Sequence, residues 1–244
     1  MSTPPTNKHP LAPIEPRRLY RHIADAISRH IDAGDFPPGS LLPAERDLAQ
    51  QLGVSRASVR EGLIALEVQG RVSVRVGNGV TVLPPPSAEQ KAALAAMPAS
   101  DWPEVGPLDV VEARRLIESE TAAMAAARVS DADLLELEAT LERMERVHLD
   151  GETHSPEDRR FHLQIAGFSG NQALVQVVAT LWDQRRSKLF ETFEEHFVTQ
   201  SLFEHTNEDH RRILDALRSR DPKAARHAMK AHLDRVHKAY SRAL

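Results

Sequence analysis

The stretch that decides the fold runs LPAERDLAQQLGVSRASVREGLIALEVQGRVSVRVGNGVTV, from residue 42 to residue 82. Apolar residues recur at helical spacing up to Leu52, and Gly53 then favours a helix end because glycine accepts a positive φ. Ser55 is a good N-cap for a second helix, which carries its apolar residues on one side until Gly70. Two short helices joined by so tight a turn indicate a helix-turn-helix unit.

The last third of the same stretch predicts a β-hairpin. Valines alternate with serine and arginine over residues 72–76, which is the period of a half-buried strand. Gly77-Asn78-Gly79 is a turn sequence, and residues 80–82 supply the returning strand. The stretch therefore predicts a winged helix-turn-helix, a unit that binds DNA. A solvated face is the alternative for any single arginine, but the ordered block favours double-stranded DNA as the partner.

A recognition helix presents the side chains of its first turns to the major groove. Arg56 and Arg60 lie there and share a face because they are four residues apart. Arg75 lies at the edge of the predicted wing. The block resembles the N-terminal domain of the GntR superfamily of bacterial transcription regulators. That resemblance rests on LPAER, LA, VSR, VRE, the spaced leucines, Gly70 and the RxGxG wing.

The GntR resemblance implies which residues contact DNA. They are Arg46, Ser55, Arg56, Ser58 and Arg60, with Gly77 at the tip of the wing approaching the minor groove. One departure is Val76, which stands where many relatives carry a lysine or arginine. The wing of this chain is therefore expected to contact DNA more weakly or at a different place.

Composition limits the class of protein. The 244 residues suggest two domains, and the net charge is −4. Residues 1–83 hold ten basic and eight acidic side chains, whereas residues 84–244 hold 21 basic and 27 acidic ones. A mildly basic DNA-binding domain joined to an acidic domain fits a sequence-specific regulator better than a protein that coats DNA nonspecifically. There are no cysteines, and no apolar run approaches the about 20 residues that span a bilayer.

The pattern along the chain predicts four regions. Residues 1–13 are proline-rich and polar, without the apolar core of a signal peptide, so we expect a disordered arm and a cytoplasmic protein. Residues 14–83 form the winged helix-turn-helix domain, beginning with a helix over about 16–31. Residues 84–106 are a proline-rich linker with one short helix at about 88–97. Residues 107–244 form a second, helical domain.

The last region is helical throughout. Residues that favour helix starts and ends predict helices over about 108–127, 131–149, 155–168, 171–198, 206–219 and 222–242. The fold class is therefore mainly α, a winged helix-turn-helix followed by an antiparallel bundle of about six helices. The interior of such a bundle commonly holds a ligand or a metal.

Asp158 and His162 are four residues apart and project from one helix face. His210 and His232 lie on two later helices. Three imidazoles and a carboxylate suit a divalent ion, Zn²⁺ above all, with Ni²⁺ or Mn²⁺ as alternatives. Spacing alone does not decide the matter, because this domain holds nine histidines. The other six are expected at the surface.

The motifs of this region resemble the effector domain, called FCD, of the FadR subfamily of GntR regulators. They are EARRLIE at 112–118, DxxFHxxI at 158–165, SGN at 169–171, HxxILxAL at 210–217 and DPxxA at 221–225, leading to His232. In many members the matching aspartate and histidines bind a metal that holds a carboxylate effector. The resemblance thus implies Asp158, His162, His210 and His232 as metal ligands.

Arginine forks suit the anion that such an ion would hold. Arg114 matches an arginine of the family, and Arg185 on the long predicted helix is a second candidate; surface pairing with glutamates is the alternative for each. Asn171 in the SGN motif completes the predicted effector-binding set. Further matches at 15–20, 106–119 and 181–185 resemble the enterobacterial regulators of hexuronate utilisation.

The sequence predicts a homodimeric repressor of a carbon-catabolism operon, not an enzyme. It would read a palindromic operator and sense a metal-held hexuronate or its keto isomer. A different small carboxylate, or the metal itself, is the alternative signal. A metal-dependent hydrolase is a remote alternative, since three histidines and an aspartate around an ion could activate water. The chain has no HExxH or other general-base signature, and an enzyme would leave the reader unexplained.

Overall fold

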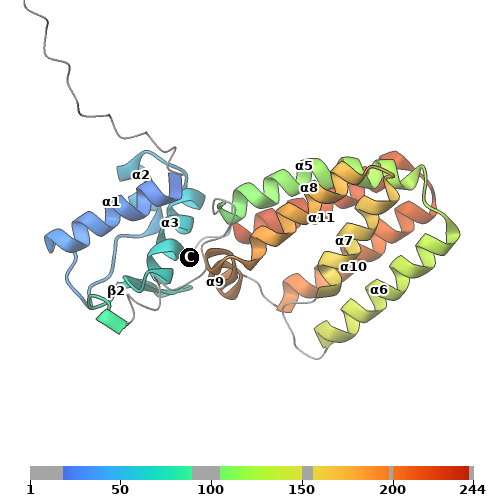
Figure 1. Cartoon of the computed structure of the whole chain (residues 1–244). Helices are drawn as coiled ribbons and strands as arrows, with labels where there is room; N and C mark the ends of the chain where they lie inside the picture. The colour runs from blue at the N-terminus through green and yellow to red at the C-terminus, as the bar shows by residue number, and fades with distance from the viewer. Residues whose placement is uncertain (1–18, 90–104, 150–155, 198–199, 242–244) are drawn as a thin grey trace, which may run out of the picture.

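The computed structural model describes residues 19–89, 105–149, 156–197 and 200–241. They form two lobes (Figure 1), and the first consists of the three helices and the hairpin of a winged helix-turn-helix. Helix α1 spans Leu19–Ala33, α2 spans Glu45–Leu52 and α3 spans Arg56–Val68. The predicted arm over residues 1–13 and most of the predicted linker helix lie outside the described residues.

The first lobe, residues 19–89, is called the reader lobe here, and local signals in its sequence explain how it folds. Gly53 ends α2 in the left-handed region, with φ of 67°, so that α3 can start within three residues. The Ser55 hydroxyl caps α3 by accepting a hydrogen bond from the Ser58 amide at 3.0 Å. Helix α1 buries Tyr20, Ile23 and neighbouring residues against α3. The predicted tight turn and N-cap are both confirmed.

The wing consists of β1, Val72–Arg75, paired antiparallel with β2, Gly79–Val82. In this register Val72 lies opposite Val82, and Val74 lies opposite Val80. All four valines are buried, so the alternation predicted from the sequence places one face of the hairpin in the core of the lobe. Arg75 and the turn after it remain exposed.

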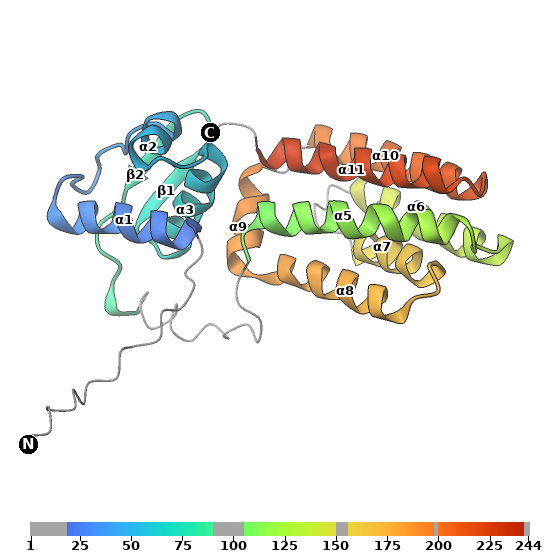
Figure 2. The ribbon, with the colours of Figure 1, turned by 90° about the horizontal axis from the view of Figure 1, so that it is seen from above.

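The second lobe is a helical bundle. It contains α5 (Pro107–Ala126), α6 (Asp131–Leu149), α7 (Pro156–Phe168), α10 (Gln200–Arg218) and α11 (Pro222–Tyr240). Helices α5 and α11 lie side by side (Figure 2), and a continuous apolar core joins α5, α6, α7, α10 and α11. The predicted fold class is confirmed. The predicted start of α10 at about residue 206 is wrong, because the helix begins at Gln200.

The long helix predicted over residues 171–198 is also wrong. The structure contains α8 (Gln172–Asp183), a 3₁₀ turn η1 (Gln184–Arg186) and α9 (Lys188–Phe197) instead. The break falls at Ser187, whose backbone is extended and whose hydroxyl accepts a hydrogen bond from the Phe190 amide at 3.2 Å. Because Ser187 acts as a new N-cap, α9 turns away from α8 and lies between the bundle and the reader lobe (Figure 1).

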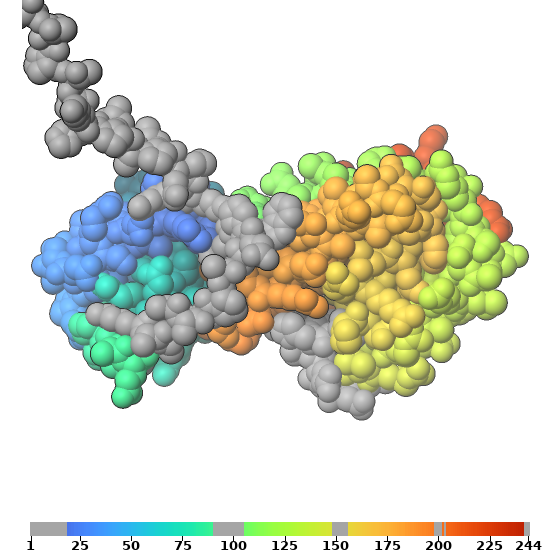
Figure 3. Space-filling view, in the orientation of Figure 1, coloured from blue at the N-terminus to red at the C-terminus, as the bar shows by residue number. Residues whose placement is uncertain are grey.

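The two lobes are distinct in the space-filling view (Figure 3) but share one apolar core. This core joins the buried side chains of α1, α3 and the wing to those of α9 and of the ends of α5 and α11. A polar contact reinforces it, since the Glu61 carboxylate of α3 accepts a hydrogen bond from the Leu108 amide at 2.9 Å. Gly106 permits this approach, because a Cβ there would lie 2.8 Å from that carboxylate. Helix α3, the recognition helix and called the reading helix below, is therefore packed against the bundle.

Candidate DNA-reading surface and buried histidine site

Most of the residues predicted to contact DNA lie at the surface of the reader lobe. Arg46, Ser55, Arg56, Arg75 and Gly77 are exposed. Ser58 is half-buried, and its hydroxyl lies 2.8 Å from that of Ser55 at the start of α3. Arg46 pairs only loosely with Asp47, and its side chain remains 80% exposed. These side chains are available to bases and phosphates.

Arg60 is the exception. Of the two arginines predicted to share one exposed face of α3, Arg56 is exposed and Arg60 is buried. Arg60 has no exposed surface, and its guanidinium donates two hydrogen bonds to Glu45 of α2, at 2.9 and 2.8 Å. A third donor reaches the backbone carbonyl of Tyr240 at the end of α11. The prediction that Arg60 contacts DNA fails for this arrangement, since the bundle covers this turn of α3.

Three imidazoles meet inside the bundle. His162 of α7, His210 of α10 and His232 of α11 are all buried, and one nitrogen of each lies within 4.8 Å of the others. The Nε2 atoms of His162 and His210 are 3.3 Å apart. Asp158, one turn before His162, places Oδ1 3.6 Å from Nε2 of His162 and 3.4 Å from Nε2 of His210. The structure thus brings together the four predicted ligands.

Glu118 of α5 fixes the orientation of one of these rings. Its Oε2 atom accepts a hydrogen bond from Nδ1 of His162, and its Oε1 atom accepts one from Nε of Arg114 at 2.6 Å. Since Nδ1 carries the proton, the Nε2 lone pair of His162 faces the other two imidazoles. Glu118 therefore sets the tautomer that a metal ligand requires.

Two arginines border the cluster, and Trp182 of α8 lies beside both. The Arg114 guanidinium lies 4.0 Å from the centre of that indole, and the Arg185 guanidinium lies 4.5 Å from it. Arg185 also donates to Oδ2 of Asp158 at 3.3 Å. Asp158 and Arg185 each keep 21% of their side chains exposed, so this side of the cluster is the open one. The predicted pair Arg114 and Arg185 thus lies at the site.

The charges of the site favour cation binding. Burial raises the pKa of Glu118, but Arg114 and His162 lower it more, and the net pKa falls from 4.5 to about 2. Burial likewise raises the pKa of Asp158, but His210 and Arg185 lower it to well below the ordinary value. Burial and the nearby imidazoles hold the pKa of His232 far below 6.5. Two carboxylates are therefore ionised, and His232 keeps a lone pair for an ion.

The donor set fits a divalent ion. Two ligands held at about 2.1 Å from the same ion lie about 3.0 Å apart in an octahedral site and about 3.4 Å apart in a tetrahedral one. The three separations among Asp158, His162 and His210 are 3.3, 3.4 and 3.6 Å. Oδ1 of Asp158 is buried without a hydrogen-bond donor among the described residues. An ion at the centre of the cluster would supply the positive charge that this oxygen lacks.

Asn171 does not belong to this site, contrary to the prediction. Its side chain is exposed and caps α8 by accepting hydrogen bonds from the amides of Ala173 and Leu174, at 3.0 and 3.4 Å. Trp182, which does touch the cluster, lies eleven residues further along the same helix. Because a helix rises about 1.5 Å per residue, this separation is about 16 Å. The SGN motif is a helix cap in this structure.

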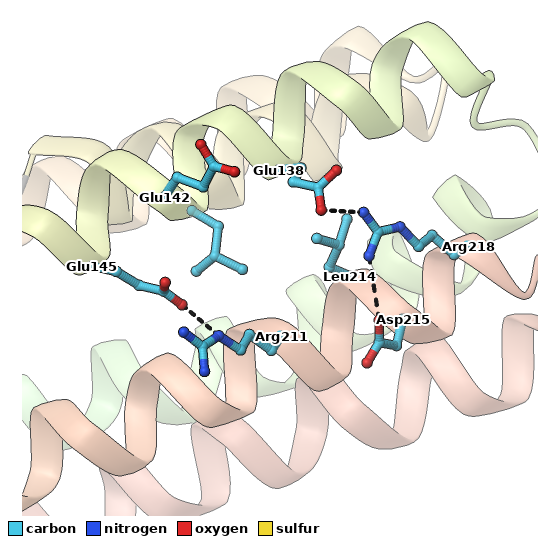
Figure 4. Close-up of a pocket in the computed structure, with 8 residues that line it drawn as sticks. Glu138, Glu142, Glu145, Arg211, Leu214, Asp215 and Arg218 are labelled. Atoms are coloured by element: carbon cyan, nitrogen blue, oxygen red, sulfur yellow. Dashed lines mark ion pairs between the residues drawn. The ribbon is translucent and has the colours of Figure 1, made fainter.

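A pocket of about 290 Å³ opens between α6 and α10 (Figure 4), and none of the three histidines lines it. Its two arginines are already neutralised: Arg211 pairs with Glu145 at 2.6 Å, and Arg218 pairs with Glu138 at 2.5 Å. No cation of the pocket is left over for an anionic ligand. The arginines of the histidine site are paired too, but that site also gathers ligands for a metal ion, so it is the better candidate for binding a small acid.

Several residues that shape the site were not predicted from the sequence. Glu118 and Trp182 lie within the motifs but received no role, although Arg114 and Glu118 show the spacing of a helical ion pair. Glu194 and Tyr240 lie outside every motif of the sequence. Glu194 accepts two hydrogen bonds from Arg185, at 3.1 and 2.7 Å, and one from the Tyr240 hydroxyl at 2.6 Å. No local pattern announces that contact, because it depends on the turn at η1.

A winged reader lobe joined to a helical bundle with a buried polar site defines a class, the one-component transcription regulators. Comparison with known proteins identifies the family. Residues 19–82 match the bacterial regulatory proteins of the gntR family, and residues 109–235 match the FCD domain. The chain belongs to the GntR family, as a DNA-binding transcription regulator of the FadR type and not an enzyme.

Three relatives illustrate the similarity. The chain is 38% identical to the Exu regulon transcriptional regulator of Escherichia coli strain K12, over 90% of this chain and 83% of that protein. It is 33% identical to the Uxu operon regulator of Haemophilus influenzae, over 90% and 80%. It is 35% identical to the putative L-lactate dehydrogenase operon regulatory protein of Escherichia coli strain K12, over 93% and 88%. None of the described helices has the length and apolarity to cross a bilayer.

Proposed function

We propose that this regulator is a homodimeric repressor that senses a sugar acid, a hexuronate or its keto isomer, through a divalent metal in the histidine site. The observation that carries the proposal is the meeting of His162, His210, His232 and Asp158 from three helices in one buried cluster. Zn²⁺ is the proposed ion, with Ni²⁺ or Mn²⁺ as alternatives.

The ion would act as the binding group for the acid. Four protein ligands leave up to two positions of an octahedral ion, enough for a carboxylate oxygen and a neighbouring hydroxyl. Asp158 and Arg185 border the open side of the cluster, where the Arg185 guanidinium is paired with Asp158 and Glu194, so a bound acid would share it with these carboxylates. Arg114, which is buried and paired with Glu118, would hold the floor of the site. A metal with an arginine at its open edge suits a small hydroxy acid.

The names of the relatives favour hexuronates over other acids. The Exu and Uxu regulators point to hexuronate catabolism, and they span most of this chain. The similar identity to a putative L-lactate dehydrogenase operon regulator supports a second candidate, L-lactate, which also carries a carboxylate next to a hydroxyl. Metal alone as the signal is the third candidate.

For the DNA side, we propose that the exposed predicted residues of the reader lobe, together with the half-buried Ser58, contact a palindromic operator. They are Arg46, Ser55, Arg56, Ser58, Arg75 and Gly77. Two reader lobes of a homodimer would occupy two half-sites, since two-fold symmetry of the protein matches a palindrome. The effector must bind the low-affinity state more tightly, because equal affinity for both states shifts nothing.

Calorimetric titration tests the effector. Metal-analysed protein is titrated with glucuronate, galacturonate, fructuronate and tagaturonate, and with L-lactate, gluconate and citrate for comparison. We expect saturable binding of one hexuronate or keto isomer that disappears after chelation and returns with Zn²⁺. Binding of L-lactate alone would transfer the proposal to lactate, and binding of none to Zn²⁺-loaded protein would refute the small-acid proposal.

The matched variants are His210→Ala, which removes a proposed ligand, and His205→Ala, which removes an exposed histidine of the same helix. Acid and metal binding should be lost in the first and kept in the second.

A further inference from the structure

The end of α11 covers the reading helix. The Tyr240 carbonyl accepts a hydrogen bond from Nη1 of Arg60 at 2.8 Å, and the Phe197 ring of α9 lies 5.2 Å from the same guanidinium. The last carbonyls of a helix have no partner within the helix, and they carry the negative end of its dipole. A guanidinium is therefore a favourable cap for α11, and Arg60 supplies it from the other lobe.

The Tyr240 side chain leads from this cap toward the bundle. Its hydroxyl donates a hydrogen bond to Oε1 of Glu194 at 2.6 Å, and its ring packs edge to face against Phe193, with centroids 5.3 Å apart. Tyr240 and Glu194 are 3% and 2% exposed, so water does not compete for this bond. The Tyr240 backbone and side chain thus connect Arg60 to Glu194.

Arg185 completes the connection. The same Glu194 oxygen accepts two hydrogen bonds from Arg185, whose remaining terminal nitrogen reaches Asp158 at the histidine cluster. An unbroken series of contacts therefore runs from the cluster through Arg185, Glu194 and Tyr240 to Arg60. Arg185 also lies at the open edge of the proposed ligand site, so it joins that site to the series of contacts.

We propose that this series is an autoinhibitory latch that holds Arg60 away from DNA, and that occupation of the histidine site acts on the latch through Arg185. The masking by Tyr240 rests on the structure alone, and the coupling to the site rests on the proposed function. A ligand that engages Asp158 or Arg185 changes what remains for Glu194, and the change reaches Tyr240 within two contacts. The structure described is thus the state of low affinity for DNA.

The test is Tyr240→Phe in the full-length chain. This variant keeps the ring and the backbone carbonyl and removes only the hydroxyl that reaches Glu194. The control is Tyr20→Phe, which removes the hydroxyl of the chain's other tyrosine, also buried and bonded to the neighbouring Arg21. Binding is measured at fixed salt, without metal, to a DNA duplex selected from a random library by the wild-type chain.

We expect Tyr240→Phe to bind the duplex about tenfold more tightly than the wild type, the size expected for loss of one hydrogen bond to a charged acceptor. Tyr20→Phe should bind as the wild type does. Unchanged or weaker DNA binding by folded Tyr240→Phe would overturn the latch. This measurement contains no effector, so its result does not depend on the proposed function.

The coupling is tested by repeating the DNA titrations with Zn²⁺ and by measuring Zn²⁺ binding calorimetrically. We expect both chains to bind Zn²⁺ equally, and the effect of Zn²⁺ on DNA affinity to shrink at least threefold in Tyr240→Phe. Equal Zn²⁺ binding with an equal effect on DNA in both chains would overturn the coupling. Failure of the wild type to bind Zn²⁺ would instead overturn the metal site, and with it the coupling but not the latch.

Discussion

Replacing Glu118 by Gln should weaken Zn²⁺ binding without touching a proposed ligand. Both oxygens of this 1% exposed carboxylate are used, one by Arg114 and one by Nδ1 of His162. A glutamine can still accept from Arg114, but it then turns its amide donor toward Nδ1. The proton of His162 moves to Nε2, the atom that must bind the ion. Loss of such an outer partner lowers metal affinity about 10- to 100-fold, or about 1.4 to 2.7 kcal/mol.

The assay is competition for Zn²⁺ with a chromophoric chelator. The matched control is Glu120→Gln, on the same helix two residues further, where an exposed carboxylate pairs with Arg226. Glu120→Gln should keep the wild-type affinity. Because Glu118→Gln also removes the charge that balances buried Arg114, thermal unfolding is followed in parallel. A folded Glu118→Gln chain with wild-type Zn²⁺ affinity would refute the assigned role of this carboxylate.

Other predictions concern the reader, the cluster and the contact between the lobes. Arg56→Ala should weaken binding to the selected duplex by about 1 to 3 kcal/mol in a gel-shift titration, whereas Arg29→Ala, an exposed change on α1, should not. His210→Ala should lose Zn²⁺ by elemental analysis while DNA binding persists; retained metal would remove this ligand. Burial raises the pKa of Glu61 from 4.5 to about 7. Between these pH values the folded chain therefore binds more protons at Glu61 than the unfolded chain does. Stability from this group is therefore present below about pH 4.5 and is lost as the pH rises to about 7. The Glu61→Gln unfolding midpoint should lack that slope, and identical pH profiles would contradict it.

The sequence predicted the reader lobe well because its signals are local. Gly53, Ser55 and the alternating valines each act within a few residues, and the structure follows them. The long helix through residue 198 failed for the same reason. No glycine or proline marks the break, and Ser187 resembles many other serines until tertiary contacts turn α9 against α3.

The site shows the same division. The resemblance to FCD domains gave Asp158 and the three histidines, which the structure brings together. It did not give the burial of Arg60, because that depends on the end of a helix 180 residues away along the chain. The prediction that Asn171 binds the effector failed because a sequence motif does not distinguish an asparagine that caps a helix from one that binds a ligand.

The apolar core shared by the lobes also gives the regulator a thermal signature. Freeing α3 exposes part of this shared core to water, including the Phe197 ring beside Arg60, and newly exposed apolar surface raises the heat capacity. Opening should therefore carry a positive heat-capacity change, and DNA binding that requires opening should show a less negative one than a free reader lobe would. Because apolar association weakens on cooling, the contact that holds α3 against the bundle should be weaker at low temperature than at high temperature.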